Sequence, residues 1–154
     1  MRISLLSMLL LASALSAQDS KTPTKPTVVF VCEHGSAKSI IAAIEFEFMA
    51  KEKGLDLIVL SRGVNPDAEI PKLIRDGLKA DGYDAGTRKP TKVSEKDLQG
   101  ATRIVSFGPD LKPWLADGTA VLDWSATPSV SDDYQKARNY IRQRLEILLK
   151  DFKK

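Results

Sequence analysis

The stretch from Cys32 to Ser39 combines residue types that could perform nucleophilic chemistry on an anion. A cysteine reacts as the thiolate, and both a nearby cation and the start of a helix favour that ionised form. Lys38 supplies the cation. Small residues between the two let successive backbone N–H groups converge on one concavity. We therefore expect Cys32 to face an oxyanion cradle formed by Glu33, His34, Gly35, Ser36, Ala37, Lys38 and Ser39.

Two regular elements flank this stretch and would position it. Residues 28–31 form an uninterrupted apolar run, typical of a strand buried on both faces of a parallel sheet. Apolar residues then recur at the spacing of an amphipathic helix, namely Ile40, Ile41, Ile44 and Phe48. This strand–loop–helix order places Cys32 at the carboxyl end of the strand. Because the free amides at a helix start attract anions, the helix would point toward the same site.

Strands and helices alternate along the rest of the chain. Further strands are predicted at residues 55–60, 103–107 and 121–122, and further helices at 71–78, at 93–100 and from Asp132 or Asp133 onward. The short helix is entered through Ser94, with Asp97 three residues later in a capping-box arrangement. The order predicts an α/β fold, a doubly wound sheet of four parallel strands whose carboxyl edge forms the ligand crevice.

The spacing Cys-x5-Lys-Ser, read between a buried strand and a helix, resembles the phosphate loop of the low-molecular-weight protein tyrosine phosphatases and the related thioredoxin-coupled arsenate reductases. Their signature is Cys-x5-Arg-Ser. The segment 61–64 is similar to the family's Ser-Ala-Gly-Thr segment after its second strand, and residues 70–82 resemble its next helix. Residues 103–107 and 124–128 resemble its third core strand and its Asp-Pro loop. The resemblance implies a phosphatase-like domain over residues 27–154.

This resemblance also implies an activity, the hydrolysis of an aryl phosphate such as phosphotyrosine through a phosphocysteine intermediate. Cys32 would attack phosphorus, the amides of residues 33–39 would hold the oxygens, and the Ser39 hydroxyl would hydrogen-bond the thiolate. Lys38 stands where the family has arginine, and an ammonium gives less geometric control of phosphate than a planar guanidinium. The implied partner is phosphate or a similar oxyanion, or a phosphotyrosine protein, and no cofactor is needed.

The acid that would protonate the leaving group has no obvious counterpart in the sequence. The family's acid is an Asp before proline, whereas Thr127 precedes Pro128 here, and threonine cannot serve. His34, the only histidine, is one candidate because histidine titrates near neutral pH. The carboxylate candidates are Asp123, Asp110, Asp132 and Asp133.

Two alternatives to a phosphatase therefore stay open. The exchanges at Lys38 and Thr127 favour a catalytically impaired module that binds an oxyanion or a phosphoprotein. An arsenate reductase-like protein is the other alternative, although those enzymes relay oxidation through additional cysteines and this sequence holds only Cys32. A metal site is not expected, because Cys32, Glu33 and His34 are consecutive and no second His or Cys completes a tetrahedral set.

Several residues outside the loop have two interpretations. Arg62 either reaches the anion site or is solvated, and Arg88 and Lys89 either select acidic substrates or belong to an exposed loop. Trp114 is expected to pack rather than to bind substrate, and Glu33 is expected to point outward.

The amino terminus predicts export. Residues 1–17 carry one positive charge, a short apolar run and small residues near Ala17, as a secretory signal peptide does, with an uncleaved anchor as the alternative. Residues 18–26 are predicted to be a flexible linker. Cleavage removes one arginine and lowers the net charge from +3 to +2, too little to favour nucleic acid or an anionic membrane. We expect a single-domain periplasmic or secreted protein with no stable membrane association.

Overall fold

The structure is a computed structural model and describes residues 24–153. Its main elements are β1 (Thr27–Cys32), α1 (Lys38–Glu52), β2 (Ile58–Gly63), α2 (Lys72–Ala80), α3 (Glu95–Gln99), β3 (Arg103–Ser106), β4 (Leu122–Asp123) and α4 (Tyr134–Leu149), with 3-10 helices at Lys112–Trp114 and Lys150–Phe152. The predicted signal peptide at residues 1–17, and the predicted linker up to residue 23, lie outside the described residues. Every helix within 24–153 is too short or too polar to traverse a lipid bilayer.

The four strands form one parallel sheet in the order β2-β1-β3-β4, which confirms the predicted α/β class. β1 is therefore central, and the run from Val28 to Val31 is completely buried, as its apolar sequence predicts. In the register between β1 and β2, Cys32 lies opposite Gly63. The carboxyl ends of these two strands thus meet at one edge of the sheet.

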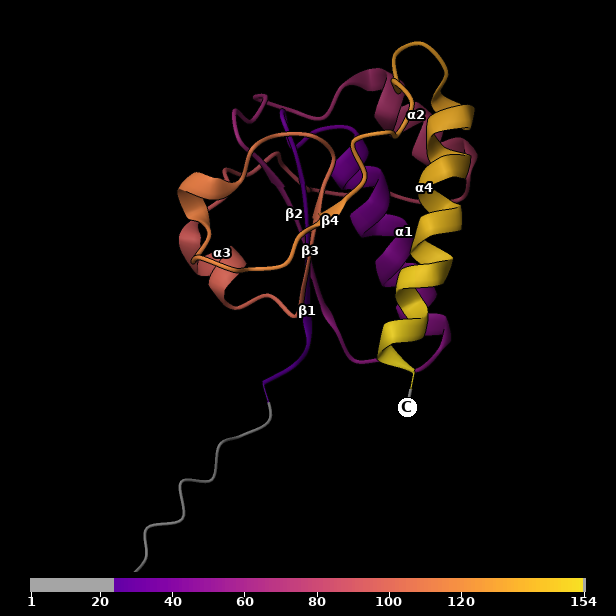
Figure 1. Cartoon of the computed structure of the whole chain (residues 1–154). Helices are drawn as coiled ribbons and strands as arrows, with labels where there is room; N and C mark the ends of the chain where they lie inside the picture. The colour runs from indigo at the N-terminus through magenta and orange to yellow at the C-terminus, as the bar shows by residue number, and fades with distance from the viewer. Residues whose placement is uncertain (1–23, 154) are drawn as a thin grey trace, which may run out of the picture.

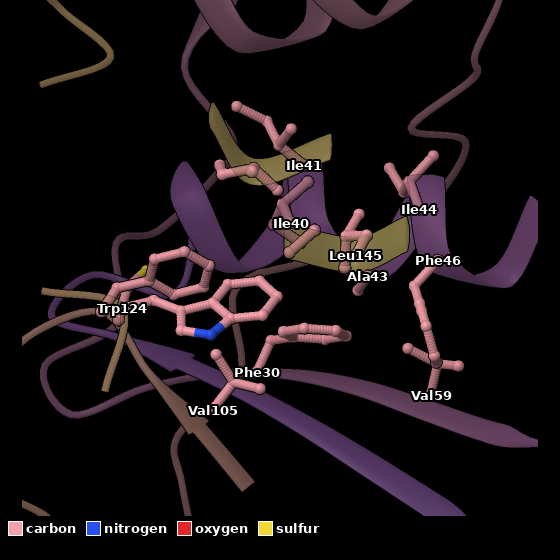
Figure 2. Close-up of a cluster of buried hydrophobic side chains, with 14 of the residues drawn as sticks. Phe30, Ile40, Ile41, Ala43, Ile44, Phe46, Val59, Val105, Trp124 and Leu145 are labelled. Carbon is pink, nitrogen blue, oxygen red and sulfur yellow. The ribbon is translucent and has the colours of Figure 1, made fainter. Parts of the chain in front are cut away.

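Helices cover both faces of the sheet, as a doubly wound fold requires (Figure 1). α1 and α4 lie along one face, over the larger hydrophobic core, while α3 lies on the other face over a smaller one. Figure 2 shows the larger core between α1 and the sheet. There the ring of Phe30 lies 5.8 Å from that of Phe46 and 6.0 Å from that of Trp124.

The observed elements differ from the sequence predictions in two respects. β2 begins at Ile58 and extends to Gly63, so Ser61, Arg62 and Gly63 belong to the strand instead of following it. α1 is not simply amphipathic, because it packs against both the sheet and α4. Phe46 is therefore buried in the core, whereas Phe48, which the helical spacing placed on the apolar face, is 47% exposed.

A buried ionic cluster joins α1, α2 and α4. Glu45 of α1 is fully buried and accepts a hydrogen bond from Nε of Arg138 in α4 at 2.6 Å. The same guanidinium lies 3.4 Å from Asp81, which also accepts a hydrogen bond from the Tyr134 hydroxyl at 3.0 Å. Burial raises the pKa of Glu45 above its usual range, although the hydrogen bond and the charge of Arg138 act to lower it.

Candidate active site

Cys32 ends β1 and is held in place by two hydrogen-bond partners. Its Sγ atom lies 3.0 Å from the hydroxyl oxygen of Ser39, and the backbone N–H of Gly35 donates to Sγ at 3.2 Å. Ser39 is fully buried and Cys32 is 6% exposed, so both atoms have fixed surroundings. Hydrogen bonds to an ionised acceptor are stronger than those to a neutral one, so this arrangement suits a thiolate.

Two glycines allow the loop after Cys32 to close over the end of β2. Gly35 has φ 61°, in the left-handed region that favours glycine. A Cβ atom on Gly63 would lie 2.6 Å from the Gly35 nitrogen, so the two backbones meet at a point where neither residue can carry a side chain. The segment 61–64, at the end of β2, therefore packs directly against the loop after Cys32.

The chain after β2 forms hydrogen bonds with the backbone carbonyl groups at the start of the loop. The N–H groups of Val64, Asn65 and Asp67 donate to the carbonyl oxygens of Cys32, Glu33 and His34, at 3.2, 2.8 and 3.1 Å. These bonds orient the peptide planes of the loop. They define its conformation before any anion binds, which is the preorganisation that an oxyanion site needs.

The start of α1 is open to an anion. Among the described residues no side chain caps α1, and its first turn contains no acidic residue. Ser94 caps α3 and Asp133 caps α4, whereas α2, like α1, has no side-chain cap within the described part of the chain. Because the first-turn N–H groups of a helix have no partners within the helix, those of α1 are available to phosphate oxygens.

Lys38 links the loop to the segment before Pro128. Its Nζ atom donates to the carbonyl oxygen of Thr127 at 2.8 Å. Thr127 is buried, and its hydroxyl donates to the carbonyl oxygen of Trp124 at 2.7 Å. One of the three ammonium protons of Lys38 is thus engaged, which leaves two for an anion.

A cavity of about 410 Å³ opens over this loop. The loop side of the cavity, which we call its floor, consists of Cys32, Glu33, His34 and residues 36–38. The walls come from Asp67, from the start of α2, from Phe107 and from residues 129–131. The α2 wall is apolar and consists of Pro71, Leu73 and Ile74. The cavity therefore combines an anion-binding floor with a largely apolar wall, and Cys32 is one of the floor residues.

Asp67 is a wall residue that sequence reasoning missed. It accepts a hydrogen bond from the Ser36 hydroxyl at 2.5 Å and lies 3.5 Å from Nδ1 of His34. The only sequence signal was indirect, since the residues after β2 lie at the ligand-binding edge of the sheet. Glu33 was expected to point outward; it is exposed but also lines the cavity, and its carboxylate accepts a hydrogen bond from the Asn65 side chain at 2.5 Å.

The structure does not bring the predicted carboxylate acids into the cavity. Asp110 and Asp123 are exposed and accept hydrogen bonds from the backbone N–H groups of Lys112 and Ser125, at 3.0 and 2.8 Å. Hydrogen bonds from the side chain and backbone of Ser125 lower the pKa of Asp123. A lower pKa leaves less of this carboxyl protonated and able to donate a proton. Asp132 is exposed, and Asp133 caps α4. None of the four lines the cavity formed by the described residues.

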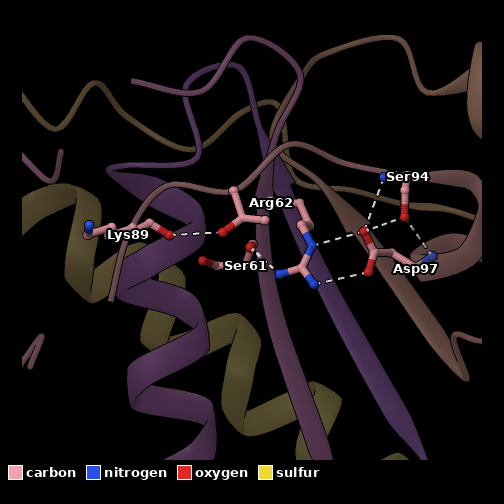
Figure 3. A network of polar contacts seen from close by, with 6 residues as sticks. Ser61, Arg62, Lys89, Ser94 and Asp97 are labelled. Carbon is pink, nitrogen blue, oxygen red and sulfur yellow. Dashed lines mark hydrogen bonds and ion pairs between the residues drawn. The ribbon is translucent and has the colours of Figure 1, made fainter. Parts of the chain in front are cut away.

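Arg62 is neither solvated nor part of the anion site. It forms a two-point ion pair with Asp97 of α3, with N–O distances of 2.9 and 3.0 Å (Figure 3). Burial acts to raise the pKa of Asp97, but hydrogen bonds from Arg62 and Ser94 outweigh it and lower that pKa. Arg62 therefore ties β2 to α3, and the predicted capping box of Ser94 and Asp97 is confirmed.

The remaining basic and aromatic candidates also lie away from the cavity. Arg88 forms an ion pair with Glu47 of α1, and Lys89 is not among the residues that line the cavity. Trp114 packs against the smaller core, as expected. Within residues 24–153, no group of three or more His, Cys, Asp or Glu side chains is arranged to hold a metal ion.

Comparison with known proteins places the fold. No protein-family model and no curated protein sequence match this chain. The structure is similar to that of a thioredoxin-dependent arsenate reductase from Corynebacterium glutamicum, with a TM-score of 0.72 and 24% identity over 85% of this chain. The aligned part spans 63% of that reductase.

Two further solved structures align with this chain over nearly their whole length. A low-molecular-weight protein tyrosine phosphatase from Streptococcus pyogenes has a TM-score of 0.72 and 14% identity, over 84% of this chain and 94% of its own. An arsenate reductase described in its phosphate-binding state has a TM-score of 0.70 and 17% identity, over 83% and 99%. The chain thus has the fold that these phosphatases and arsenate reductases share, as the sequence resemblance predicts.

Proposed function

We propose that this protein is a cysteine-dependent phosphatase that hydrolyses an aryl phosphate, such as phosphotyrosine, through a phosphocysteine intermediate. One observation carries the proposal: Cys32 Sγ, which contacts Ser39 and Gly35 at 3.0 and 3.2 Å, lies on the floor of a cavity beside the uncapped start of α1. A nucleophile and an oxyanion cradle thus occur together. These are two of the three components that thiolate-dependent phosphate hydrolysis requires.

The proposed reaction has two steps. The Cys32 thiolate attacks phosphorus, an S–P bond forms, and the P–O bond to the leaving group breaks. The N–H groups of residues 33–39 and the two remaining protons of Lys38 hold the other phosphate oxygens. Water then attacks phosphorus, and the S–P bond breaks. The Ser39 hydroxyl, 3.0 Å from Sγ, stabilises the thiolate that leaves.

The walls of the cavity support an apolar leaving group. Leu73, Ile74, Phe107 and Val130 line the cavity, and their side chains can cover an aromatic ring. A phosphotyrosine side chain, or a protein that carries one, is the substrate class that we propose. We also propose that the protein is exported and acts in the periplasm or outside the cell, which rests on the composition of residues 1–17.

A non-catalytic oxyanion-binding module is the second candidate. Lys38 supports it, because this cation is hydrogen-bonded to the Thr127 carbonyl and the residue before Pro128 is not an acid. Arsenate reduction has weaker support. The fold is shared with arsenate reductases, but Cys32 is the only cysteine of the sequence, so an external thiol would have to complete the reduction.

Turnover of para-nitrophenyl phosphate tests the proposed function. We expect the wild-type protein to release para-nitrophenol at mildly acid to neutral pH and the Cys32→Ser variant to release none. Calorimetry with inorganic phosphate is the companion measurement. Phosphate binding without turnover would replace the phosphatase by the binding module. Turnover that survives Cys32→Ser would contradict the thiolate mechanism.

A further inference from the structure

His34 and Asp67 form a pair at the cavity that has Cys32 on its floor. Both side chains line that cavity, and Nδ1 of His34 lies 3.5 Å from Oδ1 of Asp67. The two residues come from different segments, His34 from the loop after β1 and Asp67 from the chain after β2. Their proximity depends on the packing of one segment against the other.

Asp67 is held on both its backbone and its side chain. Its N–H group donates to the carbonyl oxygen of His34 at 3.1 Å, and its Oδ2 atom accepts from the Ser36 hydroxyl at 2.5 Å. The Oδ1 atom is the one that approaches the imidazole. Because Ser36 is 2% exposed, its hydroxyl is a fixed anchor for the carboxylate.

The contacts of His34 decide which ring nitrogen exchanges protons. Nδ1 lies 3.3 Å from the carbonyl oxygen of Asn65, and a carbonyl can only accept, so Nδ1 carries a proton in this contact. The side chain of His34 is 61% exposed, and the residue lines the cavity. Nε2 is therefore the atom that can give a proton to a bound substrate and take one back.

The charged groups around His34 come from the loop and from the chain after β2. Asp67 is the nearest, the Glu33 carboxylate is bonded to the Asn65 side chain, and Lys38 donates to Thr127. The α2 wall residues Pro71, Leu73 and Ile74 carry no charge, nor do residues 129–131. Asp67 is thus the anion best placed to hold an imidazolium in this cavity.

We propose that His34 is the acid that protonates the leaving oxygen and that Asp67 is the residue that positions its ring. This assignment rests on the proposed phosphatase function. As the P–O bond breaks, its electron pair stays on the leaving oxygen, which takes the proton from Nε2. Neutral His34 then removes a proton from the water that attacks phosphorus. The S–P bond breaks, the thiolate returns, and His34 is protonated again.

Two substrates that differ in their leaving group test this assignment. Phenolate leaves poorly without a proton, whereas para-nitrophenolate leaves well, so loss of the acid should slow the attack of Cys32 on phenyl phosphate and not its attack on para-nitrophenyl phosphate. For His34→Gln we expect kcat/KM with phenyl phosphate to fall at least about 100-fold, within the usual contribution of a general acid. With para-nitrophenyl phosphate, kcat/KM should fall no more than about threefold, because it reports only the attack of Cys32 on phosphorus. Loss of the base for the water step should lower kcat for both substrates.

Further variants separate a chemical role from a structural one. Added imidazole should restore phenyl phosphate turnover to His34→Ala but not to Cys32→Ser. Asp67→Asn should show the same dependence on the leaving group in weaker form, and Asp67→Glu should recover most of the loss. Asp76→Asn, at an exposed residue of α2 paired with Lys72, is the matched control and should behave as wild type.

The outcomes distinguish this assignment from the proposed function. If Cys32→Ser retains turnover, or wild type has none, the phosphatase itself is rejected. If turnover depends on Cys32 but His34→Gln lowers kcat/KM for both substrates equally or for neither, only the assignment of His34 falls. It also falls if Asp123→Asn, and not His34→Gln, produces the selective loss with phenyl phosphate.

Discussion

In the proposed mechanism the Ser39 hydroxyl acts on Cys32 and not on the substrate, because it is buried and lies 3.0 Å from Sγ. We predict that Ser39→Ala slows the breakdown of the phosphocysteine, in which the thiolate is the leaving group. A hydrogen bond to a charged group is worth roughly 1.5–3 kcal/mol, so the steady-state rate should fall about 10- to 160-fold. Stopped-flow release of para-nitrophenol should then show a burst followed by a slow phase.

Ser106→Ala is the matched control. Ser106 is buried like Ser39 but ends β3, and its hydroxyl forms hydrogen bonds with the backbone of residues 108 and 109 and not with Cys32. It should keep the wild-type ratio of burst to steady state. A Ser39→Ala variant that slows the burst and the steady state equally would show that the hydroxyl does not act on the leaving thiolate.

At the residue scale, the sequence was informative where the geometry is local. The spacing of Cys32, Lys38 and Ser39 implies one loop between a strand and a helix, and the structure has that loop. Asp67 could not be found in this way, because its place beside His34 depends on how the chain folds back after β2. Arg62 was misjudged because its partner, Asp97, lies 35 residues away in a different element.

Gly63 determines how closely β2 and the loop after β1 approach each other. A Cβ at Gly63 would lie 2.6 Å from the Gly35 nitrogen, so Gly63→Ala must push the loop away from the strand. We predict a stability loss of about 1–3 kcal/mol, the usual cost of overpacking, together with loss of phosphate binding. Urea denaturation and phosphate calorimetry measure the two effects.

Gly100→Ala provides the control, because the new Cβ would meet only the Lys96 carbonyl oxygen, at 3.4 Å, and φ is −83°. Its stability should change by less than about 1 kcal/mol. If Gly63→Ala bound phosphate as tightly as wild type, the support of the loop by β2 would be unnecessary for the site.

At the scale of elements, the order and type were predictable and the packing environment was not. The apolar run of β1 and the capping box of α3 are local signals, and both elements formed where they were expected. α1 was expected to have one apolar face, but its position between the sheet and α4 buries Phe46 and exposes Phe48. A periodic pattern cannot report how many sides of a helix will be covered.

At the scale of the whole molecule, Arg138 of α4 connects three segments, because it pairs with the buried Glu45 of α1 and with Asp81 after α2. Arg138→Met would leave Glu45 buried without its main partner, which typically costs about 3–5 kcal/mol at neutral pH. Burial already raises the pKa of Glu45 above 4.5, and loss of Arg138 raises it further. The folded state then holds a proton that the unfolded state releases, so stability falls as the pH rises.

The expected destabilisation by Arg138→Met is therefore larger at pH 8 than at pH 5, and urea unfolding at these two values measures it. Arg144→Met is the control, because that guanidinium lies 4.6 Å from the ring centre of Tyr140 in the same helix and should contribute less than about 1 kcal/mol. An equal loss at both pH values would mean that the charge of Glu45 is not what Arg138 compensates.

Direct detection of the phosphocysteine tests the central claim most sharply. The protein, in wild-type form and as Ser39→Ala, is mixed with para-nitrophenyl phosphate and denatured at neutral pH during the burst. Its peptides are then analysed by mass spectrometry. We predict a phosphoryl group on the peptide that carries Cys32, with more of it in Ser39→Ala because breakdown is slower there. Turnover accompanied by an unmodified Cys32 peptide, or by phosphate on another residue, would contradict the account.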